Sequence, residues 1–480
     1  MESLARTANR GSVSTGPYQI DNSCKFEADN TEKIQSAESD AGNRRTWTFS
    51  IWCKRTELGS GNFALWSHGD SFIGFEADKL MVSLQYSGSS DFRFKTNRLF
   101  RDTAAFYHIV VAVDTTQGTD TNRLKIYVNG VQETSFSSTG AGYPSQNFDT
   151  GFVIGSDTDH PIGNSADGAA GFCGYLSEIL FIDTLQKAPT DFGEFDDDSG
   201  IWIPKKYSGA FSGRSFWYEF KNSGSMGTDS SGNSHTGLLN NIAAADQAAD
   251  TPTNNFCTLS PLHVISNGGG NNEYTEGATK GKALETSEMA SGTVAVTQGK
   301  WYYECKALTN SDIMAGWGVP NKWGDHSVNP GYDEWSFAVH SVGRVYYYGN
   351  TYVDFSPSVT FDTNDIISVA LDADNGFCYF AKNGTWMNGG SPTSGSTGTG
   401  GFNYISGSTG ANMLIVDGDF LIPAVRTNYT TNGSILLNFG GFTTISISSA
   451  ANDANGYGTF EYAPPSGYYA LCTKNLAEYG

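Results

Sequence analysis

Aromatic, acidic and histidine side chains gather in one stretch of the chain, between residues 323 and 352. Six of them have the chemistry of a recognition surface: Trp323, Asp325, His326, Tyr332, Asp333 and Tyr352. Sugars and peptides bind shallow loop surfaces through ring stacking and through hydrogen bonds to nearby carboxylates. We therefore predict that these six residues bind a ligand, with Trp323, Asp325 and His326 on an exposed loop. The alternative is that most of the rings lie in a core or a subunit contact, and residues 346–348 have the pattern of a strand.

Carboxylates in three places could hold calcium, which takes roughly six to eight oxygen ligands, usually from several segments. The first place is Asp157 with Asp159, and the second is the acidic turn at residues 196–198. The third, residues 372–376, is more typical of a hairpin turn, because Asp and Asn are turn formers. Acidic side chains also keep proteins soluble, so the residues alone leave the calcium question open.

None of the carboxylate or histidine patterns matches an active site. A sandwich glycosidase that retains configuration needs two carboxylates about 5 Å apart on one face of a strand. The nearest approach is Glu194-Phe-Asp196, which continues as Asp-Asp-Ser-Gly and is typical of a solvated turn. Asp333 and Glu334 are adjacent, so a strand would turn them to opposite faces. With no zinc-binding histidine spacing, no nucleophile elbow and no phosphate loop, the sequence predicts a protein that is not an enzyme.

The charge and hydropathy of the chain argue against two classes of partner. The sequence has 29 lysines and arginines against 50 aspartates and glutamates, a formal net charge of −21, and no basic cluster. Counterion release cannot drive such a surface onto nucleic acid or anionic lipid. No apolar run approaches the roughly 20 residues that cross a bilayer, and residues 1–22 lack the apolar core of a secretory signal. The seven cysteines are scattered singly, which predicts buried free thiols and synthesis in a reducing cytosol.

The strands that must position these side chains follow a pattern that occurs twice. In the first copy, a β-branched run at residues 108–114 is followed by a turn and a second run that ends in Asn129-Gly130. The second copy begins at residues 365–372 and ends in Asn383-Gly384. Asn-Gly tolerates the positive φ angles of a type I′ turn and is the strongest short-range signal of a hairpin. The two copies therefore predict two three-stranded antiparallel meanders, in two related all-β domains.

The chain is too long for one ordinary core, and its patterns divide it into five segments. The predicted segments are an N-terminal docking arm (1–45), a first sandwich (46–190), a linker with an extra strand (191–279), a second sandwich (280–445) and a C-terminal extension (446–480). Thr190 is predicted to cap a short helix. The Gly-, Ser- and Thr-rich residues 388–409 are predicted to form an exposed or mobile loop.

The motifs resemble those of two domain families. The second domain resembles a SPRY domain over most of residues 280–445, on the passages Gly299-Lys-Trp-Tyr-Tyr-Glu304, Ala315-Gly-Trp-Gly-Val319, 365–372, 377–384, Leu421-Ile-Pro-Ala-Val425 and Leu437-Asn-Phe-Gly440. The first resembles the laminin-G/concanavalin-A-like lectin superfamily over about residues 45–190, on the passages Trp47-Thr-Phe-Ser-Ile-Trp52, 107–113, Ile126-Tyr-Val-Asn-Gly130, Ile154-Gly155 and 174–179. Both families are two-sheet structures. The resemblance therefore implies an all-β fold with two antiparallel β-sandwich (jelly-roll, concanavalin-A-like) domains in tandem and an extended N-terminal arm.

The resemblance to laminin-G-like domains also bears on where calcium would bind. Laminin-G-like domains often hold calcium at the rim of the sandwich, and the likeness puts Asp157 and Asp159 near that rim. It therefore implies that Asp157 and Asp159 are metal ligands, with calcium as the one cofactor suggested.

The arrangement as a whole resembles a virion structural protein of tailed phages, of marine type. This likeness rests on residues 192–196, 250–256 and 464–475. It implies a location in the virion, after assembly in the host cytoplasm and release by lysis. It also implies attachment to other virion proteins through the N-terminal arm, and a homo-oligomer, with a trimer favoured because fibres commonly are trimers.

Together these observations predict a non-enzymatic virion surface protein, a fibre, spike or head appendage that recognises the host surface by binding glycan. Several copies would add weak loop contacts to a useful avidity. The alternative is a capsid or tail decoration protein, a cement that binds only other virion proteins. A third hypothesis, a depolymerase, requires Glu194 or Asp196 to act on host polysaccharide. Neither nucleic acid nor membrane insertion is expected.

Overall fold

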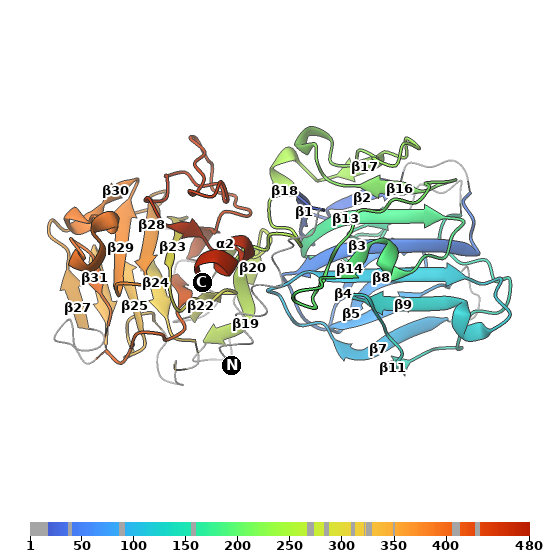
Figure 1. Ribbon diagram of the computed structural model, residues 1–480, viewed down its shortest axis with the longest axis horizontal. Coiled ribbons are helices and arrows are strands. Elements are labelled where there is room, and N and C mark those ends of the chain that lie inside the picture. The colour runs from blue at the N-terminus through green and yellow to red at the C-terminus, as the bar shows by residue number, and fades with distance from the viewer. Residues whose placement is uncertain are drawn as a thin grey trace. The chain divides into compact units, whose positions relative to one another are not determined.

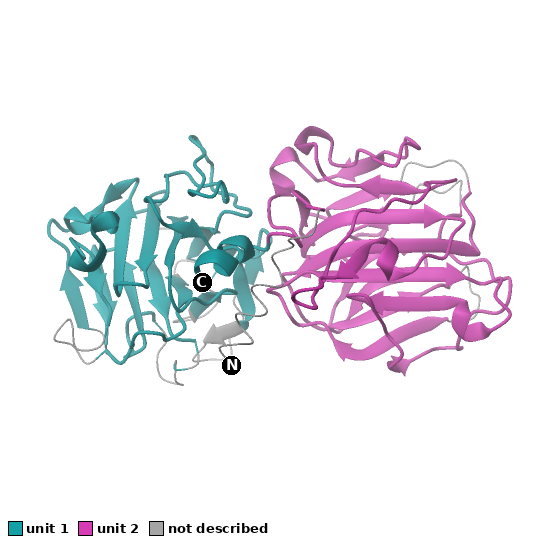
Figure 2. Cartoon of the chain, in the orientation of Figure 1, with its two compact units in different colours: residues 1–10, 255–480 teal, residues 11–254 magenta. Residues whose placement is uncertain are grey.

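The chain forms two compact units that meet, in sequence, between Asn254 and Asn255 (Figure 2). The computed structural model describes residues 18–36, 41–85, 92–154, 160–265, 273–282, 288–308, 313–320, 322, 329–348, 351–405, 413–427 and 433–480. Nearly all regular elements of these residues are β-strands, and their sheets are mostly antiparallel (Figure 1). The predicted fold class, two β-sandwiches in tandem, is confirmed. The described residues contain no helix that is long and apolar enough to cross a membrane.

The first sandwich, within residues 18–254, consists of two sheets. In hydrogen-bonded order, one sheet is β10 (Val131–Gln132), β9 (Leu124–Val128), β8 (Tyr107–Asp114), β3 (Thr46–Arg55), β13 (Gly174–Asp183), β1 (Ser23–Phe26) and β18 (Gln247–Ala248), with β16 (Phe216–Tyr218) also on β13. The other is β11 (Phe136–Ser138), β7 (Arg93–Leu99), β6 (Lys79–Ser83), β5 (Ser71–Glu76), β4 (Asn62–His68), β12 (Pro161–Ile162), β2 (Lys33–Ser36) and β17 (Gly237–Asn240). Alternate residues of β3 point into the space between the sheets, where Trp47 meets Trp66 edge to face at 5.8 Å.

A second layer of aromatic side chains covers the outer face of the sheet that contains β8. The hairpin of β14 (Gly193–Phe195) and β15 (Trp202–Pro204) and the residues around it supply this layer. Trp202 Nε1 lies 2.9 Å from Nδ1 of His108, which begins the first meander, and His108 Nε2 lies 2.9 Å from Ser50 Oγ. The imidazole also stacks on Trp52, with ring centres 4.5 Å apart. The layer explains why Thr48 and Ser50, the polar residues that alternate with the core residues of β3, are buried as well.

Segments that the sequence places outside the sandwiches contribute strands to the first one. Residues 18–36, from the predicted arm, supply β1, which pairs with β13 and β18, and β2, which pairs with β12 and β17. Residues 191–254, from the predicted linker, supply β14 to β18. A buried ion pair, Lys54 Nζ to Asp250 Oδ2 at 2.7 Å, ties the end of this segment to β3. Short strands attached by main-chain hydrogen bonds, which any residue but proline can donate, leave little trace in a sequence pattern. Residues 1–17 lie outside the described residues.

Both predicted meanders are present. β8, β9 and β10 pair in succession, as do β28 (Ile366–Asp372), β29 (Phe377–Lys382) and β30 (Thr385–Trp386). The turn residues have φ of 49° and 78° in Asn129-Gly130, and of 47° and 78° in Asn383-Gly384. In each turn the asparagine Oδ1 accepts a hydrogen bond from the main chain of the first strand of its meander, at 2.8 Å from His108 N of β8 and 2.9 Å from Ile366 N of β28. The two copies therefore share side-chain contacts as well as topology.

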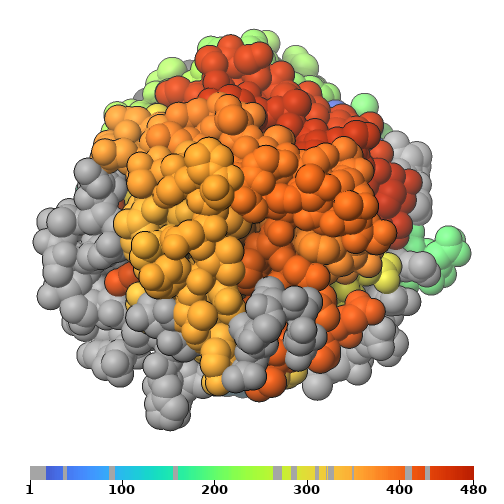
Figure 3. Space-filling view, turned by 90° about the vertical axis from the view of Figure 1, so that its left-hand side faces the viewer, coloured from blue at the N-terminus to red at the C-terminus, as the bar shows by residue number. Residues whose placement is uncertain are grey.

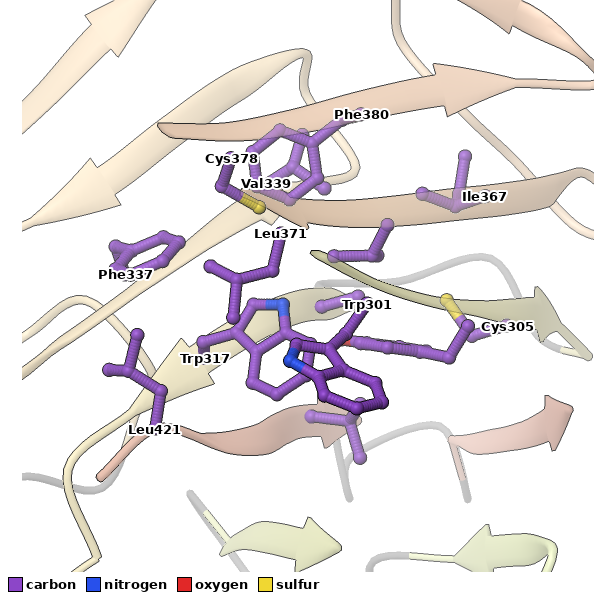
Figure 4. Packing of buried hydrophobic residues seen from close by; sticks show 14 of the residues in the cluster. Trp301, Cys305, Trp317, Phe337, Val339, Ile367, Leu371, Cys378, Phe380 and Leu421 are labelled. Atoms are coloured by element: carbon purple, nitrogen blue, oxygen red, sulfur yellow. The ribbon is translucent and has the colours of Figure 1, made fainter. Parts of the chain in front are cut away.

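The second sandwich, within residues 255–480, also has two sheets. One is β19 (Leu259–Ile265), β22 (Glu288–Gly292), β32 (Ile422–Thr427), β24 (Met314–Gly318), β25 (Ser336–His340), β26 (Arg344–Tyr347) and β27 (Thr351–Asp354). The other is β20 (Glu273–Thr275), β21 (Lys280–Lys282), β33 (Ser434–Asn438), β23 (Lys300–Ala307), β28, β29 and β30, with β31 (Phe402–Asn403) on β29 and β34 (Tyr469–Ala470) on β23. Trp301 and Trp317, from opposite sheets, lie at the centre of the core that these sheets enclose (Figure 4).

The C-terminal residues are part of this second sandwich. β34 pairs in parallel with β23, and Tyr302, Phe460, Tyr468 and Cys472 form a buried cluster on the outer side of that sheet. α2 (Thr473–Tyr479) closes the chain. The segment predicted as a C-terminal extension therefore packs as a third layer.

Two local predictions change in the structure. The helix predicted near Thr190 is a single 3₁₀ turn, η2 (Pro189–Asp191), which follows Ala188. The segment 388–409 is described as far as residue 405, and Phe402 and Tyr404 in it are buried. The rings of Phe402 and Tyr404 anchor this segment in the core, although its small and polar residues predicted an exposed or mobile loop. The seven cysteines are all free and buried, as predicted.

Candidate functional site

Strand alternation puts a polar aromatic surface on the outer face of β26 and β27. Val345 and Tyr347 of β26 face the core, so Arg344 and Tyr346 face outward. In the pairing with β27, Tyr346 lies opposite Tyr352 and Arg344 lies opposite Asp354. Figure 3 views the second sandwich from the side on which β27 is drawn in Figure 1.

Three tyrosine rings follow one another across this surface, and we call Tyr332, Tyr346 and Tyr352 the tyrosine row. The ring centres of Tyr332 and Tyr346 are 5.7 Å apart, and those of Tyr346 and Tyr352 are 5.6 Å apart. His340 lies 5.2 Å from Tyr346 on the neighbouring strand. Tyr352 keeps 44% of its surface exposed. The row therefore offers flat apolar faces and phenol hydroxyls to a ligand.

Arg344 gives the tyrosine row a positive charge. Its guanidinium carbon lies 4.1 Å from the centre of the Tyr352 ring, and its Nε donates to Asp354 Oδ1 at 2.6 Å. The cation–π contact holds Tyr352 of β27 against Arg344 of β26, and the ion pair does the same for Asp354. Because both partners are partly exposed, the pair orients the guanidinium without contributing much to stability.

Asp333 shapes the loop that carries Tyr332. Its side chain is buried, and Oδ1 accepts hydrogen bonds from Trp335 N and Ser336 Oγ, each at 2.8 Å. Gly331 N donates to the same Ser336 hydroxyl at 2.7 Å. The other oxygen, Oδ2, is buried and has no hydrogen-bond partner in the part of the chain that the structure describes. Burial raises the pKa of Asp333. The described contacts of Asp333 are therefore with its own loop.

A second cation–π contact lies near this loop. Lys322 Nζ is 4.0 Å from the centre of the Trp335 ring and 3.1 Å from Asp419 Oδ1. Glu334 O accepts a hydrogen bond from Leu414 N at 3.0 Å. The segment around Leu414, whose side chain is 44% exposed, is thereby held beside the loop.

The structure brings together some of the residues predicted to bind a ligand. Tyr332 and Tyr352 are linked through Tyr346, which the sequence indicated only as a strand residue. Arg344 on this surface and the buried His340 beside Tyr346 were not predicted, although the alternation from Tyr346 would have put Arg344 on the same face. The predicted residues Trp323, Asp325 and His326 lie outside the described residues.

The two turns considered as calcium sites form hydrogen bonds of their own. Ser199 N and Oγ both donate to Asp196 Oδ1, at 2.8 and 2.7 Å, in the turn of the β14–β15 hairpin. Asp372 accepts from Asn375 and pairs with Lys300 at 2.8 Å. No group of three or more His, Cys, Asp or Glu side chains suited to a metal occurs among the residues described. Asp157 and Asp159 are outside them.

Comparisons with known proteins agree with this architecture. Residues 28–184 match the family model of the concanavalin A-like lectin/glucanases superfamily, and residues 300–400 match that of the SPRY domain. The first match begins inside the predicted arm, in line with the strands found there.

Among solved structures, the chain is similar to the SPRY domain of human HERC1, with 16% identity, 37% of this chain and 96% of that chain covered, and a TM-score of 0.27. It is also similar to stonustoxin, with 17% identity, 38% of this chain and 27% of that chain covered, and a TM-score of 0.27. No curated protein matches the chain. The two family matches indicate a concanavalin A-like domain followed by a SPRY domain, a pair that suggests a binding function.

Proposed function

Because the chain carries a concanavalin A-like domain followed by a SPRY domain, we propose that it is a non-enzymatic recognition protein on the surface of a phage virion, where it binds host glycan. The tyrosine row, with Arg344 on its edge, is the observation that supports recognition. Pyranose rings present C–H faces that stack on aromatic rings and hydroxyls that bond to phenols and guanidinium groups.

The weak sugar binding expected of one such surface is compatible with display in many copies on a virion. A stacked aromatic contact contributes about 0.5–1.5 kcal/mol beyond the area it buries, so one exposed row binds a sugar weakly. Several copies on one particle convert weak contacts into avidity, which a fibre, spike or head appendage of homotrimers provides. The resemblance to tailed-phage proteins supports the virion location, and attachment to other virion proteins through the N-terminal arm, predicted at residues 1–45, belongs to the same proposal.

The test is binding of the purified protein to a glycan array and to whole host cells. Tyr352→Ala should weaken binding roughly fivefold, because it removes one ring of the row, while Tyr352→Phe should keep most of it. A suitable control is Phe195→Ala, which removes an aromatic side chain of similar exposure, 50%, from the first sandwich.

The alternative, a decoration protein, predicts a different result. If the wild-type protein binds no glycan and no cells but binds isolated virions that lack it, the glycan proposal is refuted and the cement function is supported.

A further inference from the structure

The guanidinium of Arg344 uses only one of its donors on the neighbouring carboxylate. Nε donates to Asp354 Oδ1 at 2.6 Å, and no hydrogen bond joins Nη1 or Nη2 to a carboxylate among the residues that the structure describes. On the first sandwich, by contrast, Arg45 binds Asp149 through two nitrogens, Nε at 2.7 Å and Nη2 at 3.4 Å. A guanidinium carries five N–H groups in a rigid fork. The edge formed by Nη1 and Nη2 of Arg344 can therefore take a second carboxylate.

The fold holds this guanidinium in place before any ligand arrives. Its carbon lies over the Tyr352 ring, 4.1 Å from the ring centre. The strand pairing sets His340 of β25 on one side of Arg344 and Asp354 of β27 on the other. The side chain of Arg344 still keeps 37% of its surface exposed. A ligand therefore meets a cation that is already oriented, and little of its binding free energy goes into ordering the side chain.

Arg344 and the tyrosine row lie on one face of the sheet. Tyr346 is two residues from Arg344 on β26, and Tyr352 is two residues from Asp354 on β27. Neighbours on the same face of a strand are roughly 7 Å apart. One hexuronate residue can span that separation, with its pyranose ring on the tyrosines and its carboxylate on the arginine.

The other charges around the row make Arg344 the one group that could attract an anion. Asp354 is already paired with it, and the Asp333 carboxylate is buried, with Oδ1 bound by Trp335 N and Ser336 Oγ. The net charge of −21 opposes anions in general. Binding of an acidic ligand here must therefore depend on the guanidinium, which makes the dependence testable at a single residue.

We infer that the tyrosine row binds an acidic sugar, a hexuronate residue of the host glycan. The pyranose ring lies on Tyr346 and Tyr352, and the carboxylate accepts two hydrogen bonds from Nη1 and Nη2 of Arg344. Such a bidentate pair is directional, so it selects a planar carboxylate over a neutral hydroxymethyl group on the same carbon. The inference rests on the proposed function, to which it adds the class of sugar.

The test is isothermal titration of the full chain with a galacturonate trisaccharide and with its methyl ester, which has the same rings without the charge. At low salt the acid should bind about tenfold more tightly than the ester, and the difference should shrink as the ionic strength rises. Arg344→Gln should lower the affinity for the acid to that for the ester. Asp354→Asn should strengthen binding of the acid, because it removes a like charge beside the ligand. Arg45→Gln removes an arginine of similar exposure that is paired with an aspartate on the first sandwich, and it should leave binding of the acid unchanged.

Each other outcome overturns the inference, and the outcomes also separate it from the proposed function. Equal affinity for acid and ester refutes selection of the carboxylate, while loss of both in Tyr352→Ala would still support glycan binding by the row. A preference for the acid that survives Arg344→Gln refutes the role of the arginine. Displacement of the trisaccharide by an equal concentration of acetate refutes the contribution of the sugar ring. Absence of binding to either trisaccharide refutes the inference, and the glycan array then decides the proposed function by itself.

Discussion

Protonation of His108 should make the first sandwich less stable in acid. Trp202 Nε1, which can only donate, lies 2.9 Å from His108 Nδ1, so Nδ1 must be the unprotonated acceptor. Nε2 then carries the single proton and donates it to Ser50 Oγ, also at 2.9 Å. The imidazole is buried, and both of its nitrogens are committed in the neutral form.

The size of the stability loss on acidification follows from the pKa of His108. Burial lowers the pKa of His108 from 6.5 to about 3. The unfolded chain therefore takes up a proton near pH 6.5, whereas the folded chain does so only near pH 3. Stability is fully present above pH 6.5 and is lost as the pH falls towards 3. At about 1.36 kcal/mol per pH unit, the two units from pH 6.5 to 4.5 correspond to a loss of about 3 kcal/mol.

The assay is urea unfolding of the full chain at pH 7 and pH 4.5, with the first sandwich followed by mass-spectrometric hydrogen exchange of peptides from β3 and β8. His108→Phe should lower stability at pH 7, because it leaves Trp202 Nε1 and Ser50 without their partner. It should also lose about 3 kcal/mol less than wild type on acidification. His235→Phe, at a partly exposed histidine of the same sandwich, is the matched control. Equal losses in wild type and His108→Phe between the two pH values would refute the reasoning.

Three further predictions concern buried groups and turns. Asp250→Ala removes the carboxylate that pairs with the buried Lys54 ammonium and should destabilise the first sandwich by about 3–5 kcal/mol in urea unfolding. Lys54→Met with Asp250→Leu should cost far less, and a cost below about 1 kcal/mol for the single change would contradict this. Gly384 has a φ of 78° and lies against the Tyr462 ring, so a methyl group there is strained. Gly384→Ala should therefore lower the free energy of unfolding of the second sandwich by about 1–3 kcal/mol, and an unchanged thermal midpoint would show that the turn accepts a side chain. Burial raises the pKa of Glu178 to about 7, so the stability that its protonated form provides is present below pH 4.5 and lost as the pH rises through 7. Glu178→Gln should therefore gain stability relative to wild type between pH 5 and pH 8, and a pH-independent difference would argue against it.

The candidate site shows how far a sequence predicts a binding surface. Residue types and their clustering in sequence were enough to single out Tyr332 and Tyr352, and strand alternation places Tyr346 and Arg344 on one face. The register between β26 and β27, which sets Tyr352 beside Tyr346 and under Arg344, belongs to a short hairpin, but period-2 alternation alone does not fix which residues lie opposite one another. The burial of Asp333 could not be predicted either, because it depends on how its loop turns back to Ser336.

The sequence by itself determined the two sandwiches. Period-2 alternation, β-branched runs and two Asn-Gly turns are local signals, and each records a local cause, the burial of alternate side chains or a positive φ angle. Only the tertiary structure decided that residues 18–36 and 191–254 supply strands to the first sandwich, and that the loop of Tyr332 packs beside Tyr346. Those features depend on main-chain pairing, on buried ion pairs such as Lys54–Asp250 and Lys25–Asp246, and on loop ends that meet in space. Because nearly every residue can make a main-chain hydrogen bond, such contacts leave no pattern for the sequence to display.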